Sequence, residues 1–162
     1  MREIKYRAFY DNMMFDVACI NMYYGNVVLL AVNEEQEKYI STINKKAMID
    51  CNNRLSVEIS KAIIQQYTGL KDKNGTEIYE GDIVKFEDVG EEGYEYKEGF
   101  DFTNYASVEF DNGRWELNNF LDNNSGILET MNSCHEDFIA EFKSFEVIGN
   151  IYENPSLLEG RE

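Results

Sequence analysis

The stretch GLKDKNGTEIYEGDIVKF, residues 69–86, decides the fold, because it contains two turn signals. It contains no catalytic motif. A two-residue turn at Asn74-Gly75 would place Asp72 opposite Glu77, and like charges directly opposite each other destabilise a strand pair. A three-residue loop removes this conflict. Asp72 then begins a type I turn and Gly75 takes the left-handed position, and these are the residue types preferred there.

The three-residue loop also gives every neighbouring side chain a suitable partner. Lys71 lies opposite Glu77, and Leu70 lies opposite Ile78, so charged groups pair with each other and apolar groups do the same. We therefore predict a hairpin arm over residues 67–79 rather than a ligand-binding loop.

The second turn signal is the tetrapeptide YEGD, in which Gly81 permits a tight corner with positive φ. The strand that follows carries Val84 and Phe86 on one face. Glu80 and Asp82 flank the corner and could bind a cation. Carboxylates beside a turn more often accept hydrogen bonds from backbone amides, and we favour that role for both residues.

The stretch SVEFDNGRWEL, residues 107–117, predicts a hairpin closed by a type I′ turn at Asn112-Gly113. Counting outward from the turn gives four cross-strand pairs: Asp111–Arg114, Phe110–Trp115, Glu109–Glu116 and Val108–Leu117. The face with Phe110, Trp115, Val108 and Leu117 is expected to lie in the core, with Trp115 as its anchor, and the two glutamates are expected to face solvent.

The first third of the chain alternates between apolar and polar residues, which is typical of strands. Residues 3–9, 14–20 and 26–32 predict an antiparallel meander. We interpret residues 33–66 as further strands; residues 33–49 could instead be helical, although they show little amphipathic contrast.

The fold class predicted from these segments is mainly β, with a β-rich α+β fold as the alternative. An N-terminal meander region, residues 1–60, precedes a barrel-like region, residues 61–162, that is SH3-like or partly open. Its strands are expected at residues 83–86, 105–110, 114–119 and 145–152. Other predicted features are a long acidic connection over 87–103 that could bind a partner, helix-like spacing over 128–142, and a final turn begun by Asn154 and Pro155.

The charge balance excludes several functions. The chain has 15 Lys and Arg residues against 31 Asp and Glu residues, and its formal net charge is -16. A nucleic-acid backbone and an anionic membrane surface would both be repelled, so we expect neither as a partner. An acidic mimic of DNA that occupies a basic host protein remains an alternative.

The sequence shows no motif for a cofactor, a metal or a nucleophile. The cysteines, Cys19, Cys51 and Cys134, are far apart, which favours reduced thiols and a cytoplasmic protein. Cys134 and His135 are adjacent, and neighbouring residues in a regular element point apart, so neither a zinc centre nor a Cys–His pair is expected. The stretch at residues 122–126 approaches a calcium loop, but position twelve falls on Ser133 rather than glutamate. We expect no catalytic, cofactor-binding or metal-binding residue.

Three blocks of the chain resemble the YopX family of bacteriophage and prophage proteins. They are MREIKYRAFYDNMMF at residues 1–15, QYTGLKDKNGTEIYEGDIVKF at 66–86 and FEVIGNIYENPSLLEG at 145–160. The resemblance implies a mostly-β protein with a small barrel-like portion and an origin in a phage or mobile element. It implies no activity. The matching residues are mostly turn and cap residues: Gly69, Asp72, Gly75, Gly81, Asp82, Gly149 and Pro155.

These observations lead to three functional hypotheses. The first is a non-enzymatic protein-binding or self-assembling module, whose partner could be a host protein or a second copy. The second is the acidic decoy of a nucleic-acid-binding host protein. The third is a hydrolase that uses carboxylates and a divalent metal, which requires carboxylates that converge in one pocket.

Overall fold

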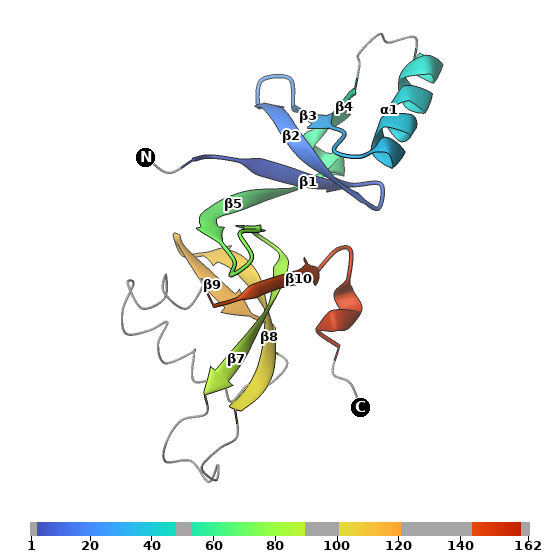
Figure 1. Ribbon diagram of the computed structural model, residues 1–162. Coiled ribbons are helices and arrows are strands. Elements are labelled where there is room, and N and C mark those ends of the chain that lie inside the picture. Colours follow the sequence, from blue (N-terminus) through green and yellow to red (C-terminus); the bar gives the residue numbers. More distant parts are fainter. Residues whose placement is uncertain (1–2, 48–52, 90–100, 121–143, 160–162) are drawn as a thin grey trace. The chain divides into compact units, whose positions relative to one another are not determined.

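The computed structural model describes residues 3–47, 53–89, 101–120 and 144–159 (Figure 1). The chain forms two compact units, and the boundary between them falls after Gln66, inside a single strand. Both units are built mainly from antiparallel strands, which confirms the predicted mainly-β class.

The N-terminal unit contains a sheet in which the meander prediction is confirmed. Its strand order is β4-β3-β2-β1-β5, and every neighbouring pair is antiparallel. The elements are β1 (Tyr6–Tyr10), β2 (Met13–Asn21), β3 (Asn26–Leu30), helix α1 (Glu34–Ala47), β4 (Arg54–Glu58), the short helix η1 (Ile59–Lys61) and β5 (Ile63–Lys71).

Helix α1 corrects the interpretation of residues 33–66 as strands alone. The Oδ1 atom of Asn33 accepts the N–H of Gln36 at 3.0 Å, as an N-cap residue does. Gln36 completes the cap, because its side chain accepts the N–H of Val32 and donates to the carbonyl of Met14. These capping contacts define the start of the helix.

The core of the N-terminal unit lies between helix α1 and the sheet. Ile40 of the helix is 1% exposed and belongs to the same buried cluster as side chains of β1, β2, β3 and β4. The complete buried cluster is Ala8, Phe15, Val27, Leu29, Ile40, Leu55 and Val57.

The C-terminal unit contains an open four-stranded sheet in the order β10-β7-β8-β9. Its elements are β6 (Glu77–Tyr79), β7 (Asp82–Val89), β8 (Asp101–Asp111), β9 (Arg114–Asn118), β10 (Glu146–Asn150) and the short helix η2 (Pro155–Leu157). Because β9 and β10 lie at opposite edges, the described strands do not close into the SH3-like barrel that the sequence suggested.

A second hydrophobic cluster fills the core of the C-terminal unit. Val84 and Phe86 share its face of β7, as predicted, and are 0% and 2% exposed. The ring of Phe86 lies against that of Phe145, with 5.0 Å between the ring centroids. The buried members of the cluster are Ile78, Val84, Phe86, Ala106, Val108, Leu117 and Phe145.

The hairpin over residues 107–117 has all four predicted cross-strand pairs. Asn112 and Gly113 both have positive φ, 48° and 85°, as a type I′ turn requires. The burial prediction is wrong for Phe110, which is 46% exposed and contacts the half-buried ring of Trp115. Burial on this face is complete at Val108 and Leu117 and decreases toward the turn.

The turn at the tip of the arm follows the prediction. Gly75 has a φ of 85°, its N–H donates to the carbonyl of Asp72 at 3.0 Å, and Lys71 lies opposite Glu77. The predicted Leu70–Ile78 pair is wrong, because β5 bulges between Tyr67 and Lys71.

The bulge in β5 has a local cause in the glycine that follows Thr68. Gly69 has a φ of 88°, which turns the strand, and the hydroxyl of Thr68 donates to the carbonyl of Ile78 at 2.8 Å. Tyr67 then lies opposite Tyr79. Two extra residues of β5 are accommodated in this way.

Several expected boundaries change. The connection over 87–103 is shorter than predicted, since β7 and β8 remain paired as far as Val89 and Asp101. The final strand ends at Asn150 instead of continuing to residue 152. Pro155 begins η2 as predicted. Residues 90–100 and the helix-like stretch 128–142 lie outside the described residues.

Candidate functional site

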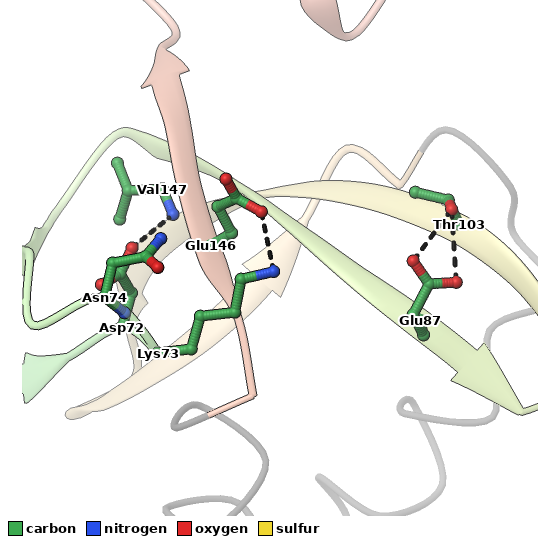
Figure 2. Close-up of polar contacts among 7 residues, drawn as sticks. All are labelled: Asp72, Lys73, Asn74, Glu87, Thr103, Glu146 and Val147. Carbon is green, nitrogen blue, oxygen red and sulfur yellow. Dashed lines mark hydrogen bonds and ion pairs between the residues drawn. The ribbon is translucent and has the colours of Figure 1, made fainter.

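Asp72 joins the tip of the hairpin arm to strand β10. Its carboxylate is buried, and Figure 2 shows it beside Asn74 and Val147. Its Oδ1 atom accepts the N–H groups of Asn74 and Thr76, both at 2.8 Å. The Oδ2 atom accepts the N–H of Val147 at 3.0 Å. One side chain therefore closes the turn and satisfies a backbone donor on β10, 75 residues away along the chain.

Lys73 adds two contacts at the same junction. Its backbone N–H donates to the carbonyl of Phe145 at 2.9 Å, and its Nζ atom lies 2.7 Å from a carboxylate oxygen of Glu146. Hydrogen bonding and the charge of Lys73 lower the pKa of Glu146. Both side chains are partly exposed, so this ion pair contributes little to stability compared with the buried Asp72.

Burial opposes ionisation of Asp72 and is the largest single influence on its pKa, but hydrogen bonds outweigh it. The N–H groups of Val147, Thr76 and Asn74 together stabilise the charged form, so the pKa of Asp72 lies below its ordinary value. Because the pKa is lower in the folded state, Asp72 stabilises the fold fully above about pH 4 and loses this contribution as the pH falls through the folded pKa.

We therefore expect stability to fall more steeply below about pH 4 in the wild type than in Asp72→Asn, since the variant lacks the titrating group. Urea unfolding of both proteins at neutral and acidic pH measures the difference. Parallel curves for the two proteins would show that Asp72 does not contribute to acid sensitivity.

Asp82, one of the two carboxylates considered as cation ligands, holds local backbone structure. Asp82 is 1% exposed, and it accepts the backbone N–H of Tyr79 at 2.8 Å and the side-chain amide of Asn150 at 3.3 Å. Glu77 accepts the hydroxyl of Tyr79 at 2.9 Å. Gly81 has a φ of 77°, which confirms the predicted corner. Within the described residues, no three His, Cys, Asp or Glu side chains are gathered as a metal site.

A polar cluster joins β8 to β9 on the face away from the core. Glu109 accepts hydrogen bonds from Ser107, Asn118 and Asn119, at 2.8–3.1 Å. The hydroxyl of Ser107 is buried among the same residues. The sequence suggested that Glu109 faces solvent. In the structure its carboxylate is instead hydrogen-bonded to these three neighbours. On the same sheet, the hydroxyl of Thr103 on β8 donates to the carboxylate of Glu87 on β7, which links these two strands (Figure 2).

The largest exposed apolar group in the described N-terminal unit is at the β2–β3 turn. Met22, Tyr23 and Tyr24, which we call the aromatic tip, are 80%, 89% and 76% exposed. The Oδ1 atom of Asn21 accepts the N–H groups of both tyrosines at 3.1 Å, and Gly25 closes the turn with a φ of 65°. The two rings contact each other edge to face, with centroids 4.9 Å apart.

No motif in the sequence marks the aromatic tip as a site. The composition of the β2–β3 turn was a usable signal for this site. Hairpin turns are usually formed by small polar residues, whereas this turn carries a methionine and two tyrosines. How far the aromatic tip projects depends on where β2 and β3 end, and the sequence predicted these ends only approximately.

The remaining candidates are placed as follows. Cys19 is an exposed free thiol on β2. Cys51, Cys134, His135 and the calcium-like stretch 122–126 lie outside the described residues. In the described ranges, no helix has the length and apolar character needed to cross a bilayer.

Comparison with known proteins identifies a family and a similar solved structure. The profile of the family described as YopX protein matches residues 5–159. Among solved structures, the crystal structure of protein EF1440 from Enterococcus faecalis is similar, with a TM-score of 0.53 and 20% sequence identity over 98% of this chain and 99% of that chain. At this identity the similarity concerns the fold alone. None of the curated proteins compared matches the chain.

Proposed function

This chain belongs to the YopX protein family, and on that basis we propose that it is a non-enzymatic accessory protein, of phage or prophage origin, that binds another protein in the bacterial cytoplasm. The aromatic tip is the proposed contact. Three adjacent large apolar side chains on one exposed turn are the observation that carries this proposal.

The aromatic tip has the properties of a protein-binding anchor. Tyrosine and methionine are enriched at protein interfaces, and each tyrosine offers a large apolar surface with a polar hydroxyl. Asn21 and Gly25 fix the backbone of the tip, so binding would order few additional groups. A preformed contact of this kind loses little conformational entropy on association.

We expect the double substitution Tyr23→Ser and Tyr24→Ser to weaken binding to a captured partner by about tenfold or more, the usual effect of removing interface aromatic residues. Folding should be unchanged, since both rings are exposed. Pull-down from bacterial lysate, followed by titration of the purified partner, measures the effect.

The matched control is Ile4→Ser, which removes another exposed apolar side chain, 73% accessible, at a different place in the same unit. It should leave binding unchanged. A partner that binds the wild type and the tip variant with equal affinity would contradict the proposed contact. A wild-type protein that captures no partner would contradict the proposed function.

The net charge of -16 favours a second candidate, the acidic decoy of a basic host protein. The two functions differ in their dependence on salt. Binding through apolar aromatic rings should persist as ionic strength rises, whereas binding through dispersed charge should weaken steeply because salt screens it. A salt titration of the same complex separates them.

A further inference from the structure

Strand β4 exposes one backbone edge of the N-terminal sheet. In the described residues it is the last strand in the order, and its inner edge pairs with β3. The carbonyl of Gly25 accepts the N–H of Ile59, and the carbonyl of Asn53 accepts the N–H of Ala31. Since hydrogen-bonded pairs recur at every second residue of an antiparallel ladder, residues 53, 55, 57 and 59 direct their backbone groups toward β3.

The backbone groups of Arg54, Ser56 and Glu58 therefore point outward from the sheet. Within the described ranges, the side-chain amide of Asn44 donates to the carbonyl of Arg54 at 3.1 Å, and this contact covers the start of the edge. The outward groups of Ser56 and Glu58 follow it. All three outward residues are exposed, while Leu55 and Val57 between them are buried against the core.

We infer that β4 pairs with β4 of a second copy of this chain, antiparallel and related by a two-fold axis at Ser56. In this register Ser56 lies opposite Ser56 of the second copy, and Arg54 lies opposite Glu58 of the second copy. The two-fold axis repeats the charged pair. Each of these residues has its N–H and carbonyl directed outward, so each pair is placed to exchange backbone hydrogen bonds, and the Arg54 carbonyl, which already accepts the Asn44 amide, would use its second lone pair.

The side chains select this register over the two-fold registers centred on Arg54 or on Glu58, and registers centred on Leu55 or Val57 leave Arg54 or Glu58 without an opposite charge. A two-fold axis at Arg54 would place two arginines opposite each other, and one at Glu58 would do the same with two glutamates. Like charges in directly opposed positions are unfavourable. The axis at Ser56 also places Leu55 opposite Val57 of the second copy, which continues the buried apolar face from one sheet into the next.

The net charge of each copy opposes this association. Two chains that each carry a formal charge of -16 repel each other at long range. Added salt screens this repulsion, whereas the backbone hydrogen bonds of the strand pair do not depend on salt. Because β4 has only five residues, we expect a weak dimer that forms at high protein concentration. This inference does not depend on the aromatic tip.

Sedimentation equilibrium over a range of concentrations, up to about 1 mM so that a weak dimer is populated, tests the pairing with charge substitutions. Arg54→Glu creates two opposed glutamate pairs, and Glu58→Arg creates two opposed arginine pairs. Each single variant should dimerise about tenfold more weakly than the wild type. The double variant restores opposite charges in reversed order and should recover the wild-type affinity at an unchanged net charge.

The decisive comparison is Glu58→Arg against the wild type. Net charge alone predicts tighter association, because the substitution makes the chain less negative, whereas the inferred register predicts weaker association. Both substituted residues are exposed, and circular dichroism checks that the variants fold. A wild-type protein that remains monomeric, a Glu58→Arg variant that dimerises at least as tightly, or a double variant without recovery would each overturn the inference.

Discussion

Replacing Asp72 with alanine is expected to lower the free energy of unfolding by about 3–5 kcal/mol, since a buried donor left without an acceptor costs about 1–3 kcal/mol. Three backbone N–H groups lose their acceptor at once, those of Asn74, Thr76 and Val147. The first two lie on an exposed turn and can be hydrated in part, which keeps the total below three full penalties. Urea unfolding of the variant measures the loss.

Two further variants show whether the loss of stability comes from the buried carboxylate of Asp72. Asp72→Asn keeps one acceptor oxygen and should recover part of the loss. Asp111→Ala is the matched control, because Asp111 also precedes a tight turn but is exposed, and we expect it to cost less than about 1 kcal/mol. If Asp72→Ala were no more destabilising than Asp111→Ala, the buried carboxylate would not be holding β10.

Gly149→Ala is expected to destabilise the C-terminal unit by about 2–3 kcal/mol, the typical cost of overpacking. The added Cβ would lie 2.7 Å from Oδ1 of Asn154 and 2.8 Å from a methyl carbon of Leu157. Asn154 cannot move away freely, because its Oδ1 atom accepts the N–H of Asn150 at 3.2 Å. The segment after β10 should therefore detach from the sheet. Urea unfolding measures the stability, and limited proteolysis measures the exposure of this segment.

The crowding at Gly149 can be separated from a general effect of replacing glycine. Combining Gly149→Ala with Leu157→Ala removes one of the two closest contacts, so the double variant should lose less stability than the sum of the single variants. Gly75→Ala serves as a control for backbone strain, because Gly75 has positive φ but open space around it. Unchanged stability and unchanged proteolysis of Gly149→Ala would contradict the close packing of η2.

The features that the sequence predicted correctly are those determined by neighbouring residues. The hairpin over 107–117 was predicted pair by pair, because Asn112-Gly113 specifies both the turn type and the register. The turn after Asp72 was predicted for the same reason, since charge pairing and the left-handed glycine both act within a few residues.

The features that the sequence did not predict depend on contacts that neighbouring residues do not specify. Helix α1 was not assigned because its apolar stripe is weak, although the capping pattern from Asn33 to Gln36 was a usable signal. The β5 bulge combines the positive φ of Gly69 with the hydrogen bond from Thr68 to Ile78 on β6. The contact of Asp72 with Val147 and the exposure of Phe110 depend on how distant strands pack.

The central claim is that the acidic residues of the 69–86 block build turns instead of a reaction centre. The most direct test is a pH titration of the backbone amide signals by nuclear magnetic resonance. If Asp72 holds both the turn and β10, the amides of Asn74, Thr76 and Val147 will shift together, with one midpoint below the ordinary pKa of aspartate. Separate midpoints for these amides, or a common midpoint above that value, would contradict the claim.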